Sequence, residues 1–316
     1  MKRERMESLI GRIIRRELGK EAGKITRQTT GFCNDVYSVA LPKGSVIIRL
    51  NRDPQSILGS RKYIPIFRKR GIKVPVILGE DYSRETVPYA YQIMTRFPGR
   101  DLGQVIKGLT GRQLHGIAGH VASVFRKLRN IPTNGKYGYV GAQDKKGVFP
   151  SWTAYMRHGT ERDIYRGRKT GVIDEDMVRI IRKIFADNRA YFDGVPSKFY
   201  FDDISSKNVM VYRGKFSGIV DLDGVTYGDY LEAVGRIAAG WHGTRYGDVY
   251  AKAVMDELKL SKEQRKIVAV YAVLNRFDWL CEWGWRFNRD TSGKIDWRIV
   301  KRDKRIIRSL ARAIES

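Results

Sequence analysis

The sequence has few of the residues that build covalent crosslinks or metal centres. Only two of its 316 residues are cysteines and only four are histidines. Cys33 and Cys281 stand far apart, and neither they nor the histidines show metal-ligand spacing, which argues against a structural zinc site. Such low cysteine use is typical of a reducing compartment, so we expect a cytoplasmic protein.

Long hydrophobic runs are also missing. No apolar stretch reaches the length of a membrane span, and the N-terminus has no continuous apolar segment of the signal-peptide type. The first apolar residues instead recur at helical spacing and predict an amphipathic helix: Met6, Leu9, Ile10, Ile13 and Ile14. We therefore expect no membrane partner, and the sequence indicates no protein partner.

Acidic residues are scarce relative to basic ones. The chain has 60 Lys and Arg against 34 Asp and Glu, a net charge of +26. The charged surface of a thermophile is one explanation, but ion-pair networks need both signs in similar number. A surplus of one sign repels itself unless an anion binds it. The balance favours a polyanion partner, RNA first, over a non-specific basic surface or an anionic membrane face.

Short strands are predicted throughout the first third of the chain. Five segments with β-type patterns are bounded by glycine, proline or asparagine: 25–28, 36–41, 46–50, 74–78 and 89–94. Residues 56–70 predict one helix, interrupted near Pro65 and ended by Gly71. The Phe97-Pro-Gly-Arg break then closes a mostly antiparallel lobe over residues 1–97.

Helical periodicity dominates residues 98–316. Amphipathic patterns predict helices over 112–130, 177–191, 264–285 and 301–314. Two short strands lie between the second and the third of these. The last helix has a basic outer side that fits either a solvated face or a track for a phosphate backbone. The fold class is therefore α+β, with a small antiparallel sheet lobe and a larger, mostly helical lobe.

One motif carries most of the chemical information. Asp203 and Asn208 stand five residues apart, and Asp221 and Asp223 end the following apolar run. Phosphoryl transfer needs a carboxylate to receive the proton of the attacking hydroxyl, and oxygen ligands to hold Mg²⁺ on the nucleotide phosphates. Such residues also cap turns, and one of them alone would indicate no more than a turn. The occurrence of all four residues together at these spacings favours a catalytic site.

These motifs resemble the aminoglycoside phosphotransferase and choline kinase branch of the protein-kinase-like fold. Asp203-Ile-Ser-Ser-Lys-Asn208 is similar to the catalytic loop of that family, and Val220-Asp221-Leu-Asp223 to its metal motif. Tyr227-Gly-Asp229 is similar to the segment that supports the loop. The resemblance implies a two-lobed kinase that uses ATP or another nucleoside triphosphate with Mg²⁺.

The resemblance also implies a role for individual residues. Asp203 would be the catalytic base, with Lys207 beside the transferring phosphoryl group. Asn208 and Asp221 would hold the metal, and Asp223 would assist it or cap the turn. The remaining matches imply contacts to the nucleotide. A loop would cover the phosphates and Arg49 would bind them; the loop residues are Thr30, Gly31, Phe32, Cys33 and Asn34. An adenine pocket would be formed by Met94, Thr95, Phe97, Met210 and Val220.

Two positions depart from the family pattern. Phe201 stands where the family has a histidine in its catalytic loop. The helix after Arg49 should carry a glutamate that pairs with this cation, but no acidic residue occurs between Asp53 and Glu80. The partner of Arg49 therefore stays open at this point.

The kind of molecule that accepts the phosphoryl group is predicted from the charge of the chain. Helix 264–285 offers Asp278 and Glu282 but no dense acidic cluster, so a polycation such as an aminoglycoside suits a chain of +26 poorly. An RNA hydroxyl fits better, and the chain resembles the archaeal tRNA kinases of heat-loving organisms, which phosphorylate a ribose 2′-OH. Two alternatives are a small-molecule kinase for a sugar, an inositol or a phosphorylated metabolite, and a non-catalytic RNA-binding pseudokinase.

Overall fold

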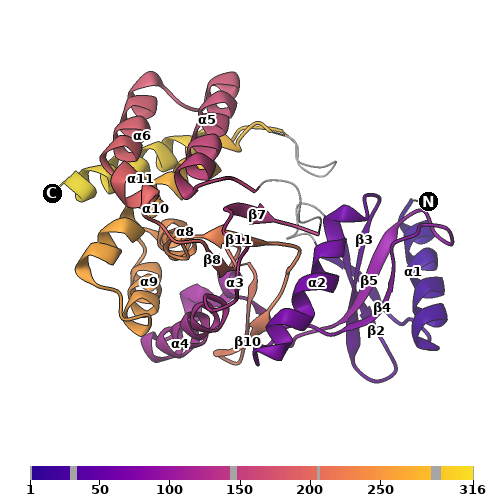
Figure 1. Cartoon of the computed structure of the whole chain (residues 1–316). Helices are drawn as coiled ribbons and strands as arrows, with labels where there is room; N and C mark the ends of the chain where they lie inside the picture. Colours follow the sequence, from indigo (N-terminus) through magenta and orange to yellow (C-terminus); the bar gives the residue numbers. More distant parts are fainter. Residues whose placement is uncertain (1, 29–33, 143–147, 205–206, 286–292, 316) are drawn as a thin grey trace. The chain divides into compact units, whose positions relative to one another are not determined.

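The computed structural model describes residues 2–28, 34–142, 148–204, 207–285 and 293–315. The chain has an α+β fold with an antiparallel sheet in one lobe and a helical second lobe, as predicted (Figure 1). It divides into two compact units. The first comprises Met1–Gly99, Gly141–Asp144 and Ser217–Gly224, and the second comprises the rest. The segment with Asp221 and Asp223 thus belongs to the first unit.

A five-stranded antiparallel sheet forms the centre of the first unit, in the order β1-β2-β3-β5-β4. Its strands are β1 (Ile25–Gln28), β2 (Asp35–Ala40), β3 (Ser45–Asn51), β4 (Ile77–Asp81) and β5 (Ala90–Thr95). Strand β3 lies in the middle and pairs with β2 and β5. This central place in the sheet fixes the position of Arg49 on β3.

Helices α1 (Lys2–Leu18) and α2 (Gln55–Lys69) flank this sheet (Figure 1). Side chains alternate between the two faces of a strand. Val46, Ile48 and Leu50 of β3 join the apolar cluster that α1 covers. Arg49 points the other way and donates to Ser60 on α2. The sheet of the first unit therefore has an apolar face that α1 covers, and on its other face Arg49 makes a polar contact with α2.

Helix α2 runs through Pro65, where the sequence predicts an interruption. Proline removes one backbone donor from a helix and usually bends or ends it. Here Pro65 lies on the exposed side, whereas Tyr63, Ile64 and Phe67 are buried. Water can satisfy the carbonyl that loses its donor, and the buried side chains hold the helix in place.

Strand β4 begins at Ile77, three residues later than predicted. Pro75 has no N–H to give to a ladder, which disfavours a strand around it. The Val76 N–H bonds instead to the Thr95 hydroxyl at 2.9 Å, and a register shift follows between Ile77 and Gly79. The strand therefore starts only after Pro75 and Val76, and it contains the register shift.

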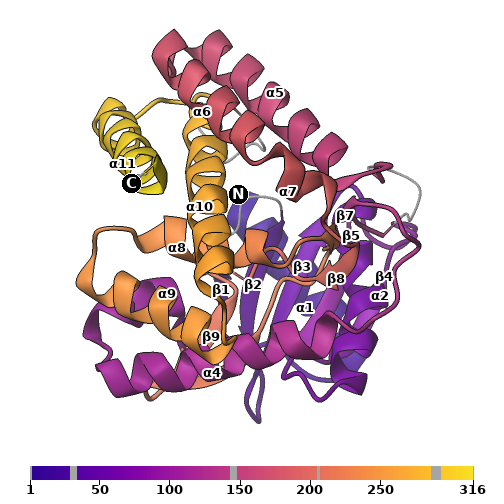
Figure 2. The ribbon, with the colours of Figure 1, turned by 60° about the vertical axis from the view of Figure 1, so that its left-hand side comes forward.

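The second unit is built mainly from helices packed around α10 (Figure 2). Its longer helices are α4 (Gly111–Leu128), α5 (Trp152–Thr170), α6 (Glu175–Asp187), α8 (Leu231–Trp241), α9 (Arg245–Glu257), α10 (Lys262–Cys281) and α11 (Trp297–Glu315). Shorter turns of helix are α3 (Leu102–Val105), η1 (Ile106–Gly108) and α7 (Arg189–Asp193). Helix α10 contacts α5, α8 and α11. None of the described helices combines the length and apolar character needed to cross a bilayer.

Two small sheets accompany these helices. One has the order β10-β9-β6 and the other β7-β11-β8. Their strands are β6 (Arg100–Asp101), β7 (Gly138–Val140), β8 (Lys198–Tyr200), β9 (Val209–Tyr212), β10 (Lys215–Ile219) and β11 (Val225–Gly228). The Asp203–Asn208 turn joins β8 to β9, so each of its ends is held in a different sheet.

Helices α5, α8 and α9 were not predicted from the sequence. Helix α8 contains two glycines, which normally weaken a helix. Gly235 is needed there because a Cβ at this position would lie 2.4 Å from the Tyr271 Cβ on α10. Close packing of two helices therefore overrides local propensity.

The buried ion pair between α10 and α11 should stabilise the second unit. Arg276 and Asp303 are 2.7 Å apart, with side chains only 8% and 6% exposed. Because Asp303→Ala leaves a buried charge without its carboxylate, we expect a loss of about 3–5 kcal/mol in the free energy of unfolding. Urea unfolding followed by circular dichroism measures this loss.

A matched control is the exposed pair of Lys183 and Asp187 on α6, whose side chains are 60% and 55% exposed. Asp187→Ala should cost less than about 1 kcal/mol, because water screens an exposed pair. Equal losses for the two variants would contradict the assignment of Asp303 as a buried counter-charge.

Candidate active site

The Asp203–Asn208 turn is anchored by apolar residues. Phe201 and Ile204 are each only 1% exposed, and Val209 is fully buried. Phe201 thus fills an apolar position where the family pattern has a histidine. The side-chain amide nitrogen of Asn208 donates to the Asp203 carbonyl at 2.9 Å and to its carboxylate Oδ2 at 2.7 Å. Through these two bonds the amide nitrogen of Asn208 holds the Asp203 carboxylate in place.

Arg236 on α8 is the main positive charge near this turn. Burial alone would lower the pKa of Arg236, but the charges of Glu232, Asp202 and Asp203 more than reverse this effect and raise it. Arg236 also pairs with Glu232 at 3.4 Å. The carboxylates of Asp202 and Asp203 therefore lie near a cation that stays charged.

Further carboxyl groups from α5 and α10 extend this arrangement. Burial, and then the charge of Asp278, raise the pKa of Asp163 to about 8 and that of Glu282 to about 7. We call these residues the acid cluster: Asp163, Asp202, Asp203, Glu232, Asp278 and Glu282, coupled to Arg162, Arg166 and Arg236. The sequence pointed to Asp203, Asp278 and Glu282 but not to Asp163 and Glu232, because these two come from α5 and α8, far from the motif along the chain.

The first unit holds the remaining carboxylates of the motif. Arg49 is 4% exposed, and its guanidinium donates to Asp221 at 3.0 Å and to both carboxylate oxygens of Asp223. Burial would lower the pKa of Arg49, whereas Asp223 and Asp221 raise it above its ordinary value. Arg49 therefore takes its counter-charges from the metal motif, because α2 has no acid to offer.

Helix α2 approaches this segment closely. A Cβ at Gly59 would lie 1.8 Å from the carbonyl oxygen of Asp223, so only glycine fits there. The next residue, Ser60, donates its hydroxyl to Asp223 and accepts a bond from Arg49. No sequence pattern indicated Gly59 or Ser60, since neither belongs to a motif.

Asp221 has an unusual backbone conformation. Its φ is +66°, in the left-handed region that few residues other than glycine adopt. Aspartate tolerates this region better than most residues because its short polar side chain can bond locally. About half of the Asp221 side chain is exposed, at 49%. Asp221 thus lies in a left-handed conformation two residues after the end of β10, with its side chain half exposed.

Some predicted nucleotide contacts lie outside the described residues, namely Thr30, Gly31, Phe32 and Cys33. Asn34 is described, and its side-chain oxygen accepts from Asn51 on β3 at 2.7 Å. Asn34 is therefore held against the sheet strand that carries Arg49.

The predicted adenine contacts divide between the units. Met94 and Thr95 end β5, and the Thr95 N–H already donates to the Val76 carbonyl at 2.9 Å, so this donor is used within the protein. The Phe97 ring covers Gly218, where a Cβ would lie 2.4 Å from the ring. Val220 follows in the same unit and is half-buried.

Met210 and Lys207 belong to the second unit. Met210 on β9 is half-buried and pairs with Asp101 on β6. Lys207 is exposed and directly precedes Asn208. The structure therefore leaves the Lys207 side chain at the surface next to the catalytic turn.

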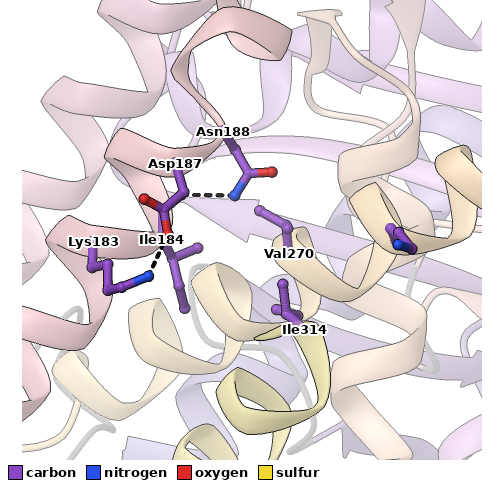
Figure 3. A pocket seen from close by; sticks show the side chains of 7 residues that line it. Lys183, Ile184, Asp187, Asn188, Val270 and Ile314 are labelled. Carbon is purple, nitrogen blue, oxygen red and sulfur yellow. Dashed lines mark hydrogen bonds and ion pairs between the residues drawn. The ribbon is translucent and has the colours of Figure 1, made fainter. Parts of the chain in front are cut away.

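A shallow pocket of about 440 Å³ lies elsewhere in the second unit (Figure 3). Residues from α6, α10 and α11 line it, including Lys183, Asp187 and Val270. Lys183 and Asp187 pair with each other at 2.7 Å. None of the predicted catalytic or nucleotide-binding residues lines it, so its volume says nothing about the reaction.

The family model of the phosphotransferase enzyme family, APH, matches residues 24–265, more than half of the chain. The chain belongs to this family. Family membership confirms the prediction of a phosphotransferase that uses an alcohol group as acceptor. A comparison with curated protein sequences finds no significant match.

Several solved structures share the fold. An aminoglycoside phosphotransferase APH(4)-Ia is 14% identical, with a TM-score of 0.69 and 98% of each chain covered. A putative fructosamine-3-kinase from Haemophilus somnus is 13% identical, with a TM-score of 0.63 over 95% of this chain and 96% of the other. A streptomycin–ATP–APH(2″)-IIa ternary complex is 11% identical, with a TM-score of 0.63 and 96% of each chain covered. These likenesses confirm the fold.

The prediction of an RNA partner is wrong. The similar structures are those of small-molecule kinases, several of them solved with an aminoglycoside, and none of these points to a nucleic acid. The RNA prediction used the net charge of the whole chain, and this charge does not describe the local charge at the acceptor site. Several basic residues of α11 are also paired: Lys304 and Arg308 with Asp174, and Arg302 with Asp303.

The acid cluster predicts a pH dependence of stability. The pKa of Asp163 rises from an ordinary 3.8 to about 8 on folding, so the folded state keeps a proton that the unfolded chain loses. The stability that this group contributes is present at acidic pH and is lost as the pH rises through this window. Asp163→Asn cannot titrate, so its unfolding midpoint should fall less than that of the unsubstituted chain between roughly pH 5 and pH 8.

Thermal unfolding across this range measures the difference. Asp187→Asn, at an exposed position, serves as the control and should keep the slope of the unsubstituted chain. Identical slopes for Asp163→Asn and the unsubstituted chain would refute the assignment of a raised pKa to Asp163.

Gly59 predicts a steric effect. Gly59→Ala forces a Cβ into the Asp223 backbone, and overpacking of this kind costs about 1–3 kcal/mol. Gly11→Ala on α1 is the matched control, because a Cβ there meets nothing within 4 Å. That change should stabilise the chain by roughly 0.5–1 kcal/mol, as alanine favours a helix. Chemical unfolding of both variants tests the contrast, and a neutral Gly59→Ala would rule out the close approach.

Proposed function

We propose that this chain transfers the γ-phosphoryl group of ATP, or of another nucleoside triphosphate, to a hydroxyl of a small polar molecule that carries amino groups. The observation that carries the proposal is the bond from Asn208 to the Asp203 carboxylate at 2.7 Å. It joins the base and the metal-ligand position of the family motif. Both residues are then oriented before any substrate binds.

Asp203 would act as the general base. Its carboxylate is held at Oδ2 by Asn208 and is half-buried, so it can reach a substrate hydroxyl without being fully hydrated. A positioned carboxylate orients the attacking hydroxyl and takes its proton as the bond to phosphorus forms. Lys207, beside Asn208, would offer a positive charge to the transferring phosphoryl group.

The donor chemistry fits Mg²⁺. This ion prefers oxygen ligands, and proteins usually give it one or two carboxylates while water and phosphates supply the rest. The amide oxygen of Asn208 and the half-exposed carboxylate of Asp221 meet this requirement. Among the described residues, no group of three or more His, Cys, Asp or Glu side chains could hold a metal by itself. Bound Mg²⁺ would neutralise charge on the nucleotide phosphates.

The nucleotide contacts are proposed from the same family motif. Arg49 would bind a phosphate, and the loop at Thr30, Gly31, Phe32, Cys33 and Asn34 would cover the phosphates with backbone N–H groups. Met94, Phe97, Met210 and Val220 would line the adenine pocket. Because the Thr95 N–H is already bonded to Val76, Thr95 would take part through other atoms.

The acid cluster supports an amine-bearing acceptor. Its carboxyl groups outnumber the arginines coupled to them, although the whole chain has a net charge of +26. An ammonium group bound among these carboxyl groups would lower the raised pKa values of Asp163 and Glu282 and meet ionised carboxylates at short range. Distant surface charges are screened beyond about 8–10 Å. Hygromycin B and streptomycin, bound in several of the similar structures, are molecules of this class.

Removal of the base should abolish transfer. Asp203→Asn keeps the shape of the side chain but cannot accept the proton, so we expect kcat to fall by about 10²–10⁴-fold. Nucleotide binding should persist. Transfer from γ-labelled ATP to a panel of aminoglycosides, amino sugars and neutral sugars measures both the activity and the acceptor class.

Asp202→Asn is the matched control, because it changes the neighbouring carboxylate and spares the proposed base. It should lower acceptor affinity more than kcat. Full activity of Asp203→Asn would refute the assignment of the base. Labelling of neutral sugars alone would refute the amine requirement, and the absence of label from every small molecule would refute the proposed function.

A further inference from the structure

Arg49 is a buried cation whose own neighbouring helix provides no acid. In protein kinases the corresponding lysine on β3 pairs with a glutamate on the following helix. Helix α2 has no acidic residue in its sequence, and it offers Arg49 only the Ser60 hydroxyl, at 3.0 Å. A guanidinium that is 4% exposed must still be paired, because an uncompensated buried charge is strongly destabilising.

Asp223 satisfies this need with both oxygens. Its Oδ1 accepts from Arg49 Nη1 at 3.1 Å, and its Oδ2 accepts from Arg49 Nη2. The Ser60 hydroxyl also donates to Oδ1. A two-point pair of this kind fixes the plane of the guanidinium, which a single contact cannot do.

Asp221 contacts Arg49 differently. Only its Oδ1 accepts from Arg49, at 3.0 Å, and its side chain is 49% exposed against 19% for Asp223. A carboxylate that is half exposed and gives one oxygen to Arg49 can turn to a metal ion. One bonded at both oxygens to a buried arginine can do so only by uncovering that charge.

We infer that Asp223 is the permanent counter-ion of Arg49 and a positioning residue, and that Asp221 alone of the two presents its carboxylate to the metal. The inference rests on the proposed function and assigns Asp223 a role other than the metal ligand expected from the sequence. Asp223 replaces the missing helix acid. The orientation of Arg49 toward a phosphate is then set by the segment after β10 and not by an acid on α2.

The close contact with α2 agrees with this arrangement. Gly59 lets the helix backbone approach the Asp223 carbonyl, and Ser60 bonds the Asp223 carboxylate. The helix therefore supports the Arg49–Asp223 pair through a small and a hydroxyl-bearing residue. An acidic side chain on α2 is unnecessary because the segment after β10 brings a carboxylate to Arg49 next to Ser60.

A double-mutant cycle on the full chain without ligands tests the pairing. Asp223→Asn should lower the unfolding midpoint by roughly 3 °C or more, since it leaves a buried arginine poorly paired. The exposed Asp221→Asn should lower it less. In combination with Arg49→Met, the effect of Asp223→Asn should largely disappear, because the charge that needs a partner is gone. Equal coupling of Arg49 to both aspartates would overturn the inference.

Measurements of nucleotide binding distinguish a residue that positions Arg49 from a residue that binds the metal. Calorimetry with ATP is run in EDTA and again with Mg²⁺. Asp223→Asn should weaken binding about tenfold in both conditions, which corresponds to about 1.4 kcal/mol. Asp221→Asn should leave binding in EDTA within about threefold and lose most of the gain that Mg²⁺ provides.

The opposite pattern would overturn the inference: unchanged binding in EDTA for Asp223→Asn with a loss of the Mg²⁺ effect equal to that of Asp221→Asn. If Asp223→Asn does not fold, Ser60→Ala removes one bond from each partner and should weaken binding equally in EDTA and in Mg²⁺. An effect of Ser60→Ala confined to Mg²⁺ would count against the inference. If the unsubstituted chain binds no nucleotide, the proposed function fails, and the unfolding cycle alone decides whether Asp223 is the counter-ion.

Discussion

The need to pair one buried arginine organises the first unit. Arg49 lies on the central strand and cannot reach water, so carboxylates must come to it. They come from the metal motif, which ties the segment of Asp221 and Asp223 to the sheet and to α2. The glycine at position 59 follows from this contact, because a side chain there would push the Asp223 backbone away. One electrostatic requirement thus links β3, α2 and the segment after β10.

The second unit meets the same requirement with more groups. Arg236 stays charged among Glu232, Asp202 and Asp203, and α5 and α10 add carboxyl groups whose pKa values are raised by burial and by one another. Six carboxyl groups thus gather around three arginines in the acid cluster, although the whole chain is strongly basic. Substrate recognition depends on charges within a few ångströms, where screening is weak, so the net charge was a poor guide to the acceptor.

Several parts of the fold could be predicted from the sequence because their signals are local. The amphipathic N-terminal helix, the strands around the hairpin at 42–45 and the helix after Thr110 all follow from periodicity and turn residues. Helix α2 passed through Pro65, and α8 formed despite Gly235, because burial against other elements outweighed propensity. The partner of Arg49 could not be predicted from local sequence signals, because Asp223 lies 174 residues further along the chain.

The sequence by itself determined the family, the kinase-like fold and the order of the motif residues, because spacing along the chain records which side chains share a turn or a strand end. Asn208 bonds Asp203 because they are five residues apart in one turn. Only the tertiary structure decided which charges neutralise one another and where carboxylates gather. Pairing of buried charges depends on distance in space and on exclusion of water, and the spacing of residues along the chain determines neither. The similar structures overturned the RNA prediction, and our proposal of an amine-bearing acceptor rests on how the carboxyl groups gather in space.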